Sequence, residues 1–220
     1  MPKNQTLDEF YSTFREEVLC ASDTETSGWT TEDFLTNVMM EYLEEAGEVT
    51  NPVICPFRGY GLQMNAYAIS EDCESVDIFV SIYSESDRPR SVSQADIDAA
   101  IKRAIQLYHK AINDLYTAFQ KDNDTYEFAI TLHQNKDNIK HVRICALTNG
   151  LVKPITLKNI TIGDAEISFS LWDVDRLYRC VTSGKMRETI EIDFEEKFQT
   201  SISCIENNTC LLYTSPSPRD

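Results

Sequence analysis

Two periodic stretches near the start of the chain predict helices. In Leu7–Cys20 the apolar residues recur three and four positions apart, which places them on one helical face. A second stripe runs through Phe34–Ala46, with Thr30 or Thr31 as the expected N-cap and Gly47 as the expected end. Each stripe indicates a helix that packs one side against a core.

Three short β-type runs follow these helices. They are Val53–Gly61, Leu62–Ser70 and Ser75–Tyr83, and the acidic stretch "EDCE" (Glu71–Glu74) is the expected turn between the last two. In both of the later runs apolar and other residues alternate, as in strands that show one face to a core. The positions expected to share that face are Leu62, Met64, Ala66 and Ala68 in one strand and Val76, Ile78, Val80 and Ile82 in the other.

The longest periodic segment starts after Ser93, the expected N-cap, and its apolar stripe continues to Phe119. Its length predicts a helix of about seven turns. The remaining chain predicts a short helix, a strand that ends in the turn signal "TNG", two strands, a helix and a last strand. These elements are expected at Thr125–Gln134, His141–Leu147, Ile155–Leu157, Glu166–Leu171, Trp172–Cys180 and Glu188–Phe194.

The order helix, three strands, long helix, strand predicts an α/β fold with a mixed sheet flanked by helices. We expect an αβββαβ core with extra C-terminal strands and a helix, in a single domain over residues 1–205. Residues 211–220 ("LLYTSPSPRD") resemble the translation of a sequencing adapter, and we expect them to be a disordered, non-native tail. On that interpretation the chain is the N-terminal fragment of a longer protein.

Charge and composition narrow the range of partners. The chain has 220 residues and a net charge of −16, and its acidic residues are concentrated in the first fifty positions. Such a surface repels phosphate backbones, so we do not expect this fragment alone to bind nucleic acid. An apolar run of about 18 residues, as a membrane span requires, is missing from the sequence, and so is a secretory signal. We therefore predict a cytoplasmic protein without membrane contact.

Thiol and imidazole chemistry receives little support. The seven cysteines form no CxxC pair, which together with the lack of a secretory signal is typical of reduced thiols. Cys145 lies in an apolar run and is interpreted as a buried core thiol. A catalytic pair of Cys145 with His133 remains an alternative, although the three histidines form no HExxH motif.

The predicted order of elements also matches that of the PD-(D/E)xK nucleases. These enzymes need an Asp on the second strand, and an acid or Gln two residues before a Lys on the third. The acidic residues hold Mg²⁺, and the Lys supports the attacking water and the developing charge. Neighbouring strands bring such groups within reach of one metal ion.

Several blocks of the chain resemble the N-terminal region of the AIPR family, the abortive-infection phage-resistance proteins of bacterial defence islands. The resembling blocks, spread over residues 7–205, are "EYLEEAGEV" (Glu41–Val49), "VDIFVSIYSES" (Val76–Ser86), "RICALTNG" (Arg143–Gly150), "LWDVDRLYR" (Leu171–Arg179) and "ETIEIDFEE" (Glu188–Glu196). The resemblance implies a nuclease-like core for this chain.

The resemblance also implies where nuclease chemistry would lie. Active members carry an Asp on the second strand and a Gln-Ser-Lys type triplet on the third, and these positions fall here at Asn65 and at Val80, Ser81 and Ile82. Asn65 is a weaker Mg²⁺ ligand than a carboxylate, and Val80 and Ile82 can neither bind metal nor activate water. We therefore expect degenerate nuclease positions at Asn65, Val80 and Ile82, with no catalytic residue, cofactor or metal.

Other acidic or aromatic residues offer weaker candidates. Glu45 and Glu48 at a helix end are interpreted as solvated, although they offer acid near the strands. Asp72, Glu74 and Asp77 lie close in sequence, but they lack EF-hand spacing and are interpreted as part of a surface turn. Trp172 is interpreted as a core residue, with a ligand platform as the alternative.

The sequence leaves three interpretations of the function. The first is a non-catalytic, nuclease-like N-terminal module of an abortive-infection protein, which contacts a protein partner or the missing C-terminal domain, or serves in sensing. The alternative is a divergent Mg²⁺-dependent nuclease whose active residues lie elsewhere or in the missing C-terminal region. A third interpretation is an accessory α/β domain linked to phage defence by association alone.

Overall fold

A six-stranded mixed sheet organises the first of the two units into which the chain divides, Met1–Lys185 and Met186–Asp220. The computed structural model describes residues 6–24, 28–121, 123–155, 157–184, 204–207 and 210–214. The helices of the first unit are α1 (Leu7–Thr24), α2 (Thr31–Glu45), α3 (Gln94–Ala111), α4 (Asp124–Gln134) and α5 (Val174–Gly184), with a 3₁₀ turn η1 (Leu115–Ala118). Its strands are β1 (Val53–Gly59), β2 (Leu62–Ile69), β3 (Ser75–Ile82), β4 (His141–Thr148), β5 (Ile160–Ile162) and β6 (Ala165–Trp172).

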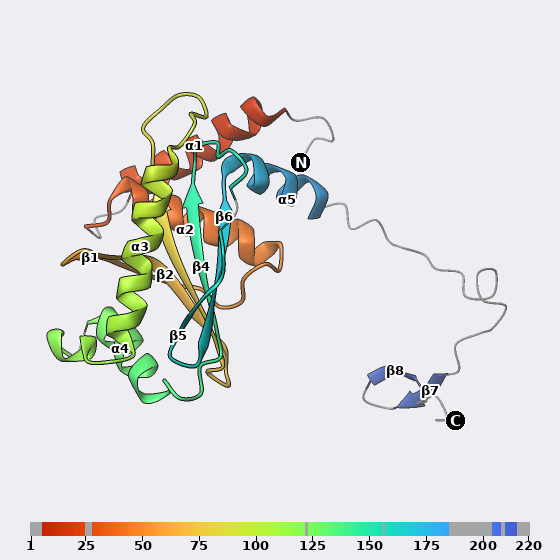
Figure 1. The fold of residues 1–220 in the computed structure, drawn as a ribbon. Coiled ribbons are helices and arrows are strands. Elements are labelled where there is room, and N and C mark those ends of the chain that lie inside the picture. Colours follow the sequence, from red (N-terminus) through yellow and green to blue (C-terminus); the bar gives the residue numbers. More distant parts are fainter. Residues whose placement is uncertain are drawn as a thin grey trace. The chain divides into compact units, whose positions relative to one another are not determined.

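The sheet combines an antiparallel and a parallel half. Its strand order is β1-β2-β3-β4-β6-β5. The pairs β1–β2, β2–β3 and β5–β6 are antiparallel, whereas β3–β4 and β4–β6 are parallel. The crossover from β3 to β4 runs through α3, which lies across one face of the sheet (Figure 1). This arrangement confirms the predicted α/β class and the mixed sheet.

Helices cover both faces of the sheet, so the sheet separates two hydrophobic cores. Val76, Ile78 and Val80 of β3 pack with α3 and α4 in one core. Phe79 of the same strand packs with α1, α2 and α5 in the other. The alternation predicted for β3 is therefore confirmed, and its second face is buried as well. Strands buried on both faces are typical of the parallel part of a sheet.

The predicted boundaries of the first two helices agree closely with the structure. Thr30 is the N-cap of α2, and Gly47 follows the helix with φ +74, a conformation that suits glycine best. The amide of Gly47 donates to the carbonyl of Glu44 at 2.9 Å, which satisfies one of the last helical carbonyls. The N-terminal end of α2 lies beside Asn65 of β2, whose Nδ2 donates to Oδ1 of Asp33.

The prediction of one long helix from Ser93 to Phe119 is wrong after Ala111. Ser93 does cap α3, but the helix ends at Ala111. The side chain of Asn113 donates to the carbonyl of His109 at 2.7 Å, so a side chain takes up one of the last free carbonyls. The apolar stripe continued past this point because Leu115 of η1 packs against the same core.

Two further boundaries differ from the predictions. The strand expected at Ile155–Leu157 lies instead at β5, where Ile160 pairs with Ile167 of β6. The helix expected from Trp172 begins at Val174, because Trp172 is the last residue of β6. Asp173 between them accepts a hydrogen bond from the amide of Arg176 at 2.8 Å, as an N-cap does.

The second unit contains a two-stranded antiparallel sheet. Its strands are β7 (Cys204–Asn207) and β8 (Cys210–Thr214). Residues 211–214, which were predicted to be disordered, therefore lie in β8. The strand predicted at Glu188–Phe194 lies outside the described residues, as do residues 215–220.

Candidate functional site

The N-terminus of α2 presents two adjacent carboxylates to the sheet. The backbone amide and the hydroxyl of Thr30 both donate to Oδ2 of Asp33, each at 2.8 Å. Carboxylates are favourable there because a helix N-terminus carries partial positive charge. Asp33 is thereby fixed and only 7% exposed, and Glu32 beside it reaches over the strands β1 and β2.

The strands β2 and β3 lose their regular pairing close to these carboxylates. Their register runs from Ile69 opposite Val76 to Ala66 opposite Phe79. Beyond that point the amide of Ser81 donates to Oδ1 of Asn65 at 2.9 Å. The side chain of Gln63 donates through Nε2 to the carbonyl of Ser81 at 3.1 Å. Two side-chain amides therefore replace the backbone ladder at this end of β2.

The same two amides also satisfy the carboxylates of α2. Nδ2 of Asn65 donates to Oδ1 of Asp33 at 3.0 Å and to Oε1 of Glu32 at 3.3 Å. Nε2 of Gln63 donates to Oε1 of Glu32 at 3.1 Å, and Arg58 of β1 forms an ion pair with that oxygen. We call Glu32, Asp33, Gln63 and Asn65 the amide network. Arg103 of α3 closes it on the other side by donating from Nε to Oε1 of Gln63 at 2.9 Å.

A β-bulge in β1 lies opposite Asn65, the residue of β2 that contacts α2. In β1 the register shifts between Ile54 and Phe57, so two residues of β1 face one residue of β2. Met64 packs in the core under α3, whereas Ala66 packs in the core under α2. The prediction that Met64 and Ala66 share one face of β2 is therefore wrong, because the strand is irregular at Asn65.

Burial and neighbouring charges act on Glu32 in opposite directions. Loss of water raises the pKa of its carboxyl group, and the negative charge of Asp33 adds to this. The positive charge of Arg58 and the hydrogen bond from Asn65 lower the pKa again, and burial remains the larger effect. Glu32 is therefore a carboxylate whose charge depends on its hydrogen-bond donors.

A cavity of about 530 Å³ opens beside the amide network, between α2, the bulge of β1 and the start of α4. Its volume is in the range of ligand pockets, about 300–1,000 Å³. Polar and apolar groups both line it, among them Trp29, Glu32, Phe57, Met64 and Asp124.

The structure does not bring the three predicted site positions together. Asn65 contacts α2 on one side of the sheet. Val80 and Ile82 pack against the core under α3 on the other side. Ser81, between them, does face α2, because its hydroxyl lies 2.7 Å from that of Thr36.

The other acidic candidates lie apart from the amide network. Glu45 and Glu48 are exposed at the opposite end of α2. Asp77 pairs with Arg143, whose Nε donates to its Oδ1 at 2.9 Å. Asp72 accepts hydrogen bonds from the Ser70 hydroxyl at 2.6 Å and the Glu74 amide at 3.0 Å, as expected of a surface turn.

The structure separates Cys145 from His133. Cys145 lies in the core under α2, and Nδ1 of His133 lies 3.1 Å from the carbonyl oxygen of Ile112 on the opposite side of the sheet. The alternative of a Cys145–His133 catalytic pair is therefore wrong. Trp172 is 4% exposed, as predicted for a core residue, and the guanidinium of Arg176 lies 3.7 Å from the centre of its ring.

Cys145 is expected to resist thiol reagents in the native protein. Burial raises the pKa of its thiol to about 12, so little thiolate forms near neutral pH. We expect roughly a thousandfold slower alkylation than at the exposed Cys20. Peptide mapping by mass spectrometry after timed alkylation would measure both rates, and unfolding in urea should remove the difference. Equal native rates would contradict the burial of Cys145.

Sequence reasoning missed most of the amide network. Glu32 and Asp33 are absent from the candidates that the sequence offers, because acidic residues are common in the first turn of a helix, and Asp33 has that capping role as well. The alternation of β2 places Gln63 on the face opposite to that of Leu62 and Met64, and Gln63 is fully buried there. The available signal was the presence of two amides, Gln63 and Asn65, at alternate positions of a strand with an otherwise apolar face.

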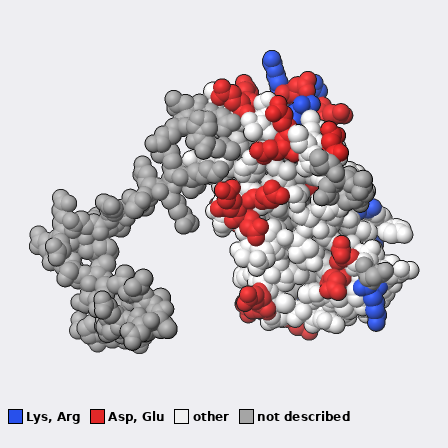
Figure 2. Space-filling model, turned by 180° about the vertical axis from the view of Figure 1, so that it is seen from behind, with Lys and Arg blue, Asp and Glu red and all other residues white. Residues whose placement is uncertain are grey.

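Acidic side chains dominate the surface of α1 and α2. Asp8, Glu16, Glu17, Glu41 and Glu44 are exposed there, and Figure 2 shows more Asp and Glu than Lys and Arg on the face opposite to that of Figure 1. Among the described residues, no three His, Cys, Asp or Glu side chains gather as ligands for a metal ion. A helix long and apolar enough to span a membrane is not found in the described part of the chain.

Comparison with known proteins identifies the family to which the chain belongs. Neither the curated proteins nor the solved structures contain a match to this chain. Residues 35–179 do match the N-terminal domain of the abortive infection phage resistance proteins. This segment starts within α2, runs through the whole six-stranded sheet and ends within α5. The chain therefore belongs to the family of abortive infection phage resistance proteins and contains their N-terminal domain.

Proposed function

We propose that this domain is a non-catalytic, nuclease-like module of a phage-defence protein, and that it serves in partner contact or sensing. The order of α2, β1, β2, β3, α3 and β4 supports a likeness to the nuclease core. The proposal rests mainly on the amide network, which lies where β2 and β3 separate. In a nuclease of this type, the metal site would occupy that place.

The residues of β3 beside Asn65 support the loss of catalysis. Phe79 packs under α2, and Ser81 bonds to Asn65 and Thr36. Glu32 also accepts a hydrogen bond from the backbone of Tyr83. Whichever of these positions corresponds to the acid and lysine of a nuclease, the residue there is neither acidic nor basic.

Hydrogen-bond donors take the place that a cation would have between the carboxylates. Glu32 and Asp33 are both satisfied by Asn65, and Glu32 also by Gln63 and Arg58. A divalent ion would have to displace these donors before it could bind the carboxylates. Buried amides without partners are costly, at about 1–3 kcal/mol each, so displacement is unfavourable.

We expect the purified protein to leave plasmid DNA, linear DNA and RNA intact in Mg²⁺ or Mn²⁺. The physical reason is that β3 supplies no lysine beside the carboxylates, so water is not activated there. Gel electrophoresis after incubation at 37 °C would measure cleavage.

Two variants locate any cleavage that appears. Glu32→Gln removes a carboxylate of the amide network, and Glu44→Gln removes an exposed carboxylate of the same helix. Cleavage that EDTA and Glu32→Gln abolish, and Glu44→Gln leaves unchanged, would overturn the proposal. It would support the alternative of a divergent Mg²⁺-dependent nuclease.

A further inference from the structure

The outer edge of β1 is an unpaired strand edge next to a cavity. β1 is the terminal strand of the sheet order, and its register partners all lie in β2. Within the described part of the chain, no other backbone group hydrogen-bonds to β1. An open edge of this kind can pair with an extended segment of another protein.

Apolar side chains mark the two ends of this edge. Val53 at its start is 43% exposed, and Tyr60 just beyond its end is 89% exposed. Tyr60 also has φ +54, an unfavourable conformation for a bulky residue, which the tight turn to Gly61 imposes. The hairpin therefore holds a tyrosine in solvent at a conformational cost, as is common at contact surfaces.

Pro56 and the bulge interrupt the middle of the edge. Pro56 has no amide hydrogen, so continuous pairing with a flat strand is not available. At this point the cavity of about 530 Å³ opens, with Cys55, Pro56 and Phe57 in its lining. A bound segment would therefore pair its backbone beside the cavity and place a side chain inside it.

The charges of the cavity determine which side chain fits. Glu32, Asp33 and Asp124 line it, and Arg58 is the one basic residue among its described lining. The Thr125 amide at the start of α4 is already capped by the protein itself, since it donates to Asn123 Oδ1 at 2.8 Å. The negative charge is therefore in excess, and a cationic side chain is favoured over an anion.

Arg58 supports this choice because it already places a guanidinium beside Glu32. The side chain of Arg58 is 62% exposed, whereas that of Glu32 is 18% exposed. A lysine or arginine from a partner would add a second cation near Glu32 and Asp124. Burial and hydrogen bonding would strengthen the attraction between this cation and the two carboxylates.

We propose that this groove, formed by the outer edge of β1 and the adjoining cavity, binds an extended segment of a partner protein that carries lysine or arginine. The segment adds its backbone to β1 and places a cationic side chain in the cavity. This inference rests on the proposed role in partner contact and names the surface and the chemistry of the partner.

Fluorescence anisotropy with defined peptides tests the groove. The probe is a labelled octapeptide in which Val and Thr alternate with three Lys, and its control carries Glu at the Lys positions. We expect the lysine peptide to bind and the glutamate peptide not to bind. Asp124→Asn should weaken binding at least fivefold, because Asp124 lines the cavity and is exposed. Glu44→Gln, which removes a charge outside the groove, should weaken binding less than twofold.

Hydrogen exchange adds a readout that general charge attraction would not change. We expect the lysine peptide to slow amide exchange within residues 53–58. Equal weakening by Asp124→Asn and Glu44→Gln, or unchanged exchange in β1, would overturn the groove and leave the non-catalytic proposal in place. Nucleic-acid cleavage that depends on Glu32 would overturn the non-catalytic proposal and leave the groove in place.

Discussion

Replacing Gly150 by alanine is expected to lower the free energy of unfolding by about 3 kcal/mol. A Cβ atom at Gly150 would overlap Cγ2 of Val92 and would lie 2.6 Å from the carbonyl oxygen of Arg90. That oxygen accepts a hydrogen bond from the Leu151 amide at 2.7 Å, so it cannot retreat without losing this bond. Urea denaturation followed by circular dichroism would measure the loss.

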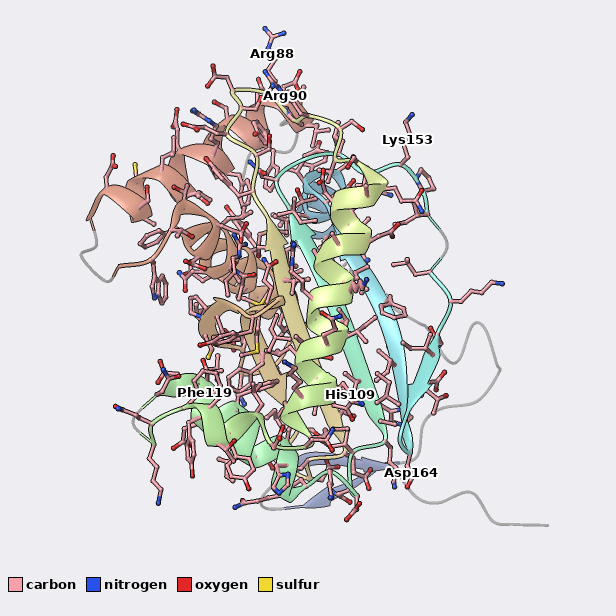
Figure 3. All side chains as sticks on the ribbon, turned by 60° about the vertical axis from the view of Figure 1, so that its left-hand side comes forward. Arg88, Arg90, His109, Phe119, Lys153 and Asp164 are labelled. Carbon is pink, nitrogen blue, oxygen red and sulfur yellow. The ribbon has the colours of Figure 1, made fainter. Side chains whose placement is uncertain are left out.

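The loop that approaches Gly150 is fastened by the neighbouring asparagine. Asn149 accepts from the Ser84 amide at 2.9 Å and donates to the Ser84 carbonyl at 2.8 Å. The segment after β3, which carries Arg88 and Arg90 in Figure 3, is therefore held at both ends. Asn149, within the turn sequence "TNG", therefore helps to attach this segment to the end of β4.

Gly59→Ala is the matched control for this prediction. A Cβ atom at Gly59 would meet the ring of Phe57 at 3.6 Å, which is ordinary van der Waals contact. We expect a change within about 0.5 kcal/mol, as for other substitutions without a steric or polar conflict. Equal stability of the two variants would contradict the close approach at Gly150.

Replacing Asn65 by aspartate is expected to destabilise the domain by about 3–5 kcal/mol at pH 8. The change removes the donor that serves Asp33 and Glu32 and places a third negative charge between them. Protonation of the new carboxyl group would restore a donor, so its pKa in the folded state is expected to lie above that in the unfolded state. The folded state then binds more protons, and the loss should shrink as the pH falls toward 5.

Asn37→Asp provides the control for the charge itself. Asn37 donates to Glu41 at 2.8 Å on the exposed side of α2, so the same substitution there also brings two carboxylates together. Water screens this pair, and we expect a loss of about 0.5 kcal/mol with little dependence on pH. Urea denaturation at pH 5 and pH 8 would compare the two variants, and an Asn65→Asp variant as stable as Asn37→Asp would contradict the account of the amide network.

Periodicity predicted the layers of the fold because both cores need apolar faces of regular spacing. The stripe of α2 and the alternation of β3 correspond directly to the two cores. Errors arose where polar side chains interrupt a regular element without breaking its apolar pattern. The side chain of Asn113 bonds to the carbonyl of His109 near the end of α3, while Leu115 continues the apolar stripe, so hydrophobicity alone could not locate the end of the helix.

The candidate site was harder to predict because its geometry depends on an irregularity. A strict period of two places Gln63 and Asn65 together, but Met64 and Ala66 pack in opposite cores, so β2 breaks this period at Asn65, opposite the bulge of β1. The family resemblance pointed to Asn65, but the accompanying positions Val80 and Ile82 belong to the opposite face. Tertiary contacts with Glu32 and Asp33 of α2, which are distant in sequence, identify the network.

Binding of Mn²⁺ to the wild-type protein tests the central claim most directly. The claim is that side-chain amides occupy the place of a metal between Glu32 and Asp33. The electron paramagnetic resonance signal of free Mn²⁺ would be followed as the ion is titrated into the wild-type, Glu32→Gln and Glu44→Gln proteins. We predict identical titrations for the three proteins, with weak surface binding alone. One ion bound per chain in the wild type and in Glu44→Gln, and lost in Glu32→Gln, would contradict the claim.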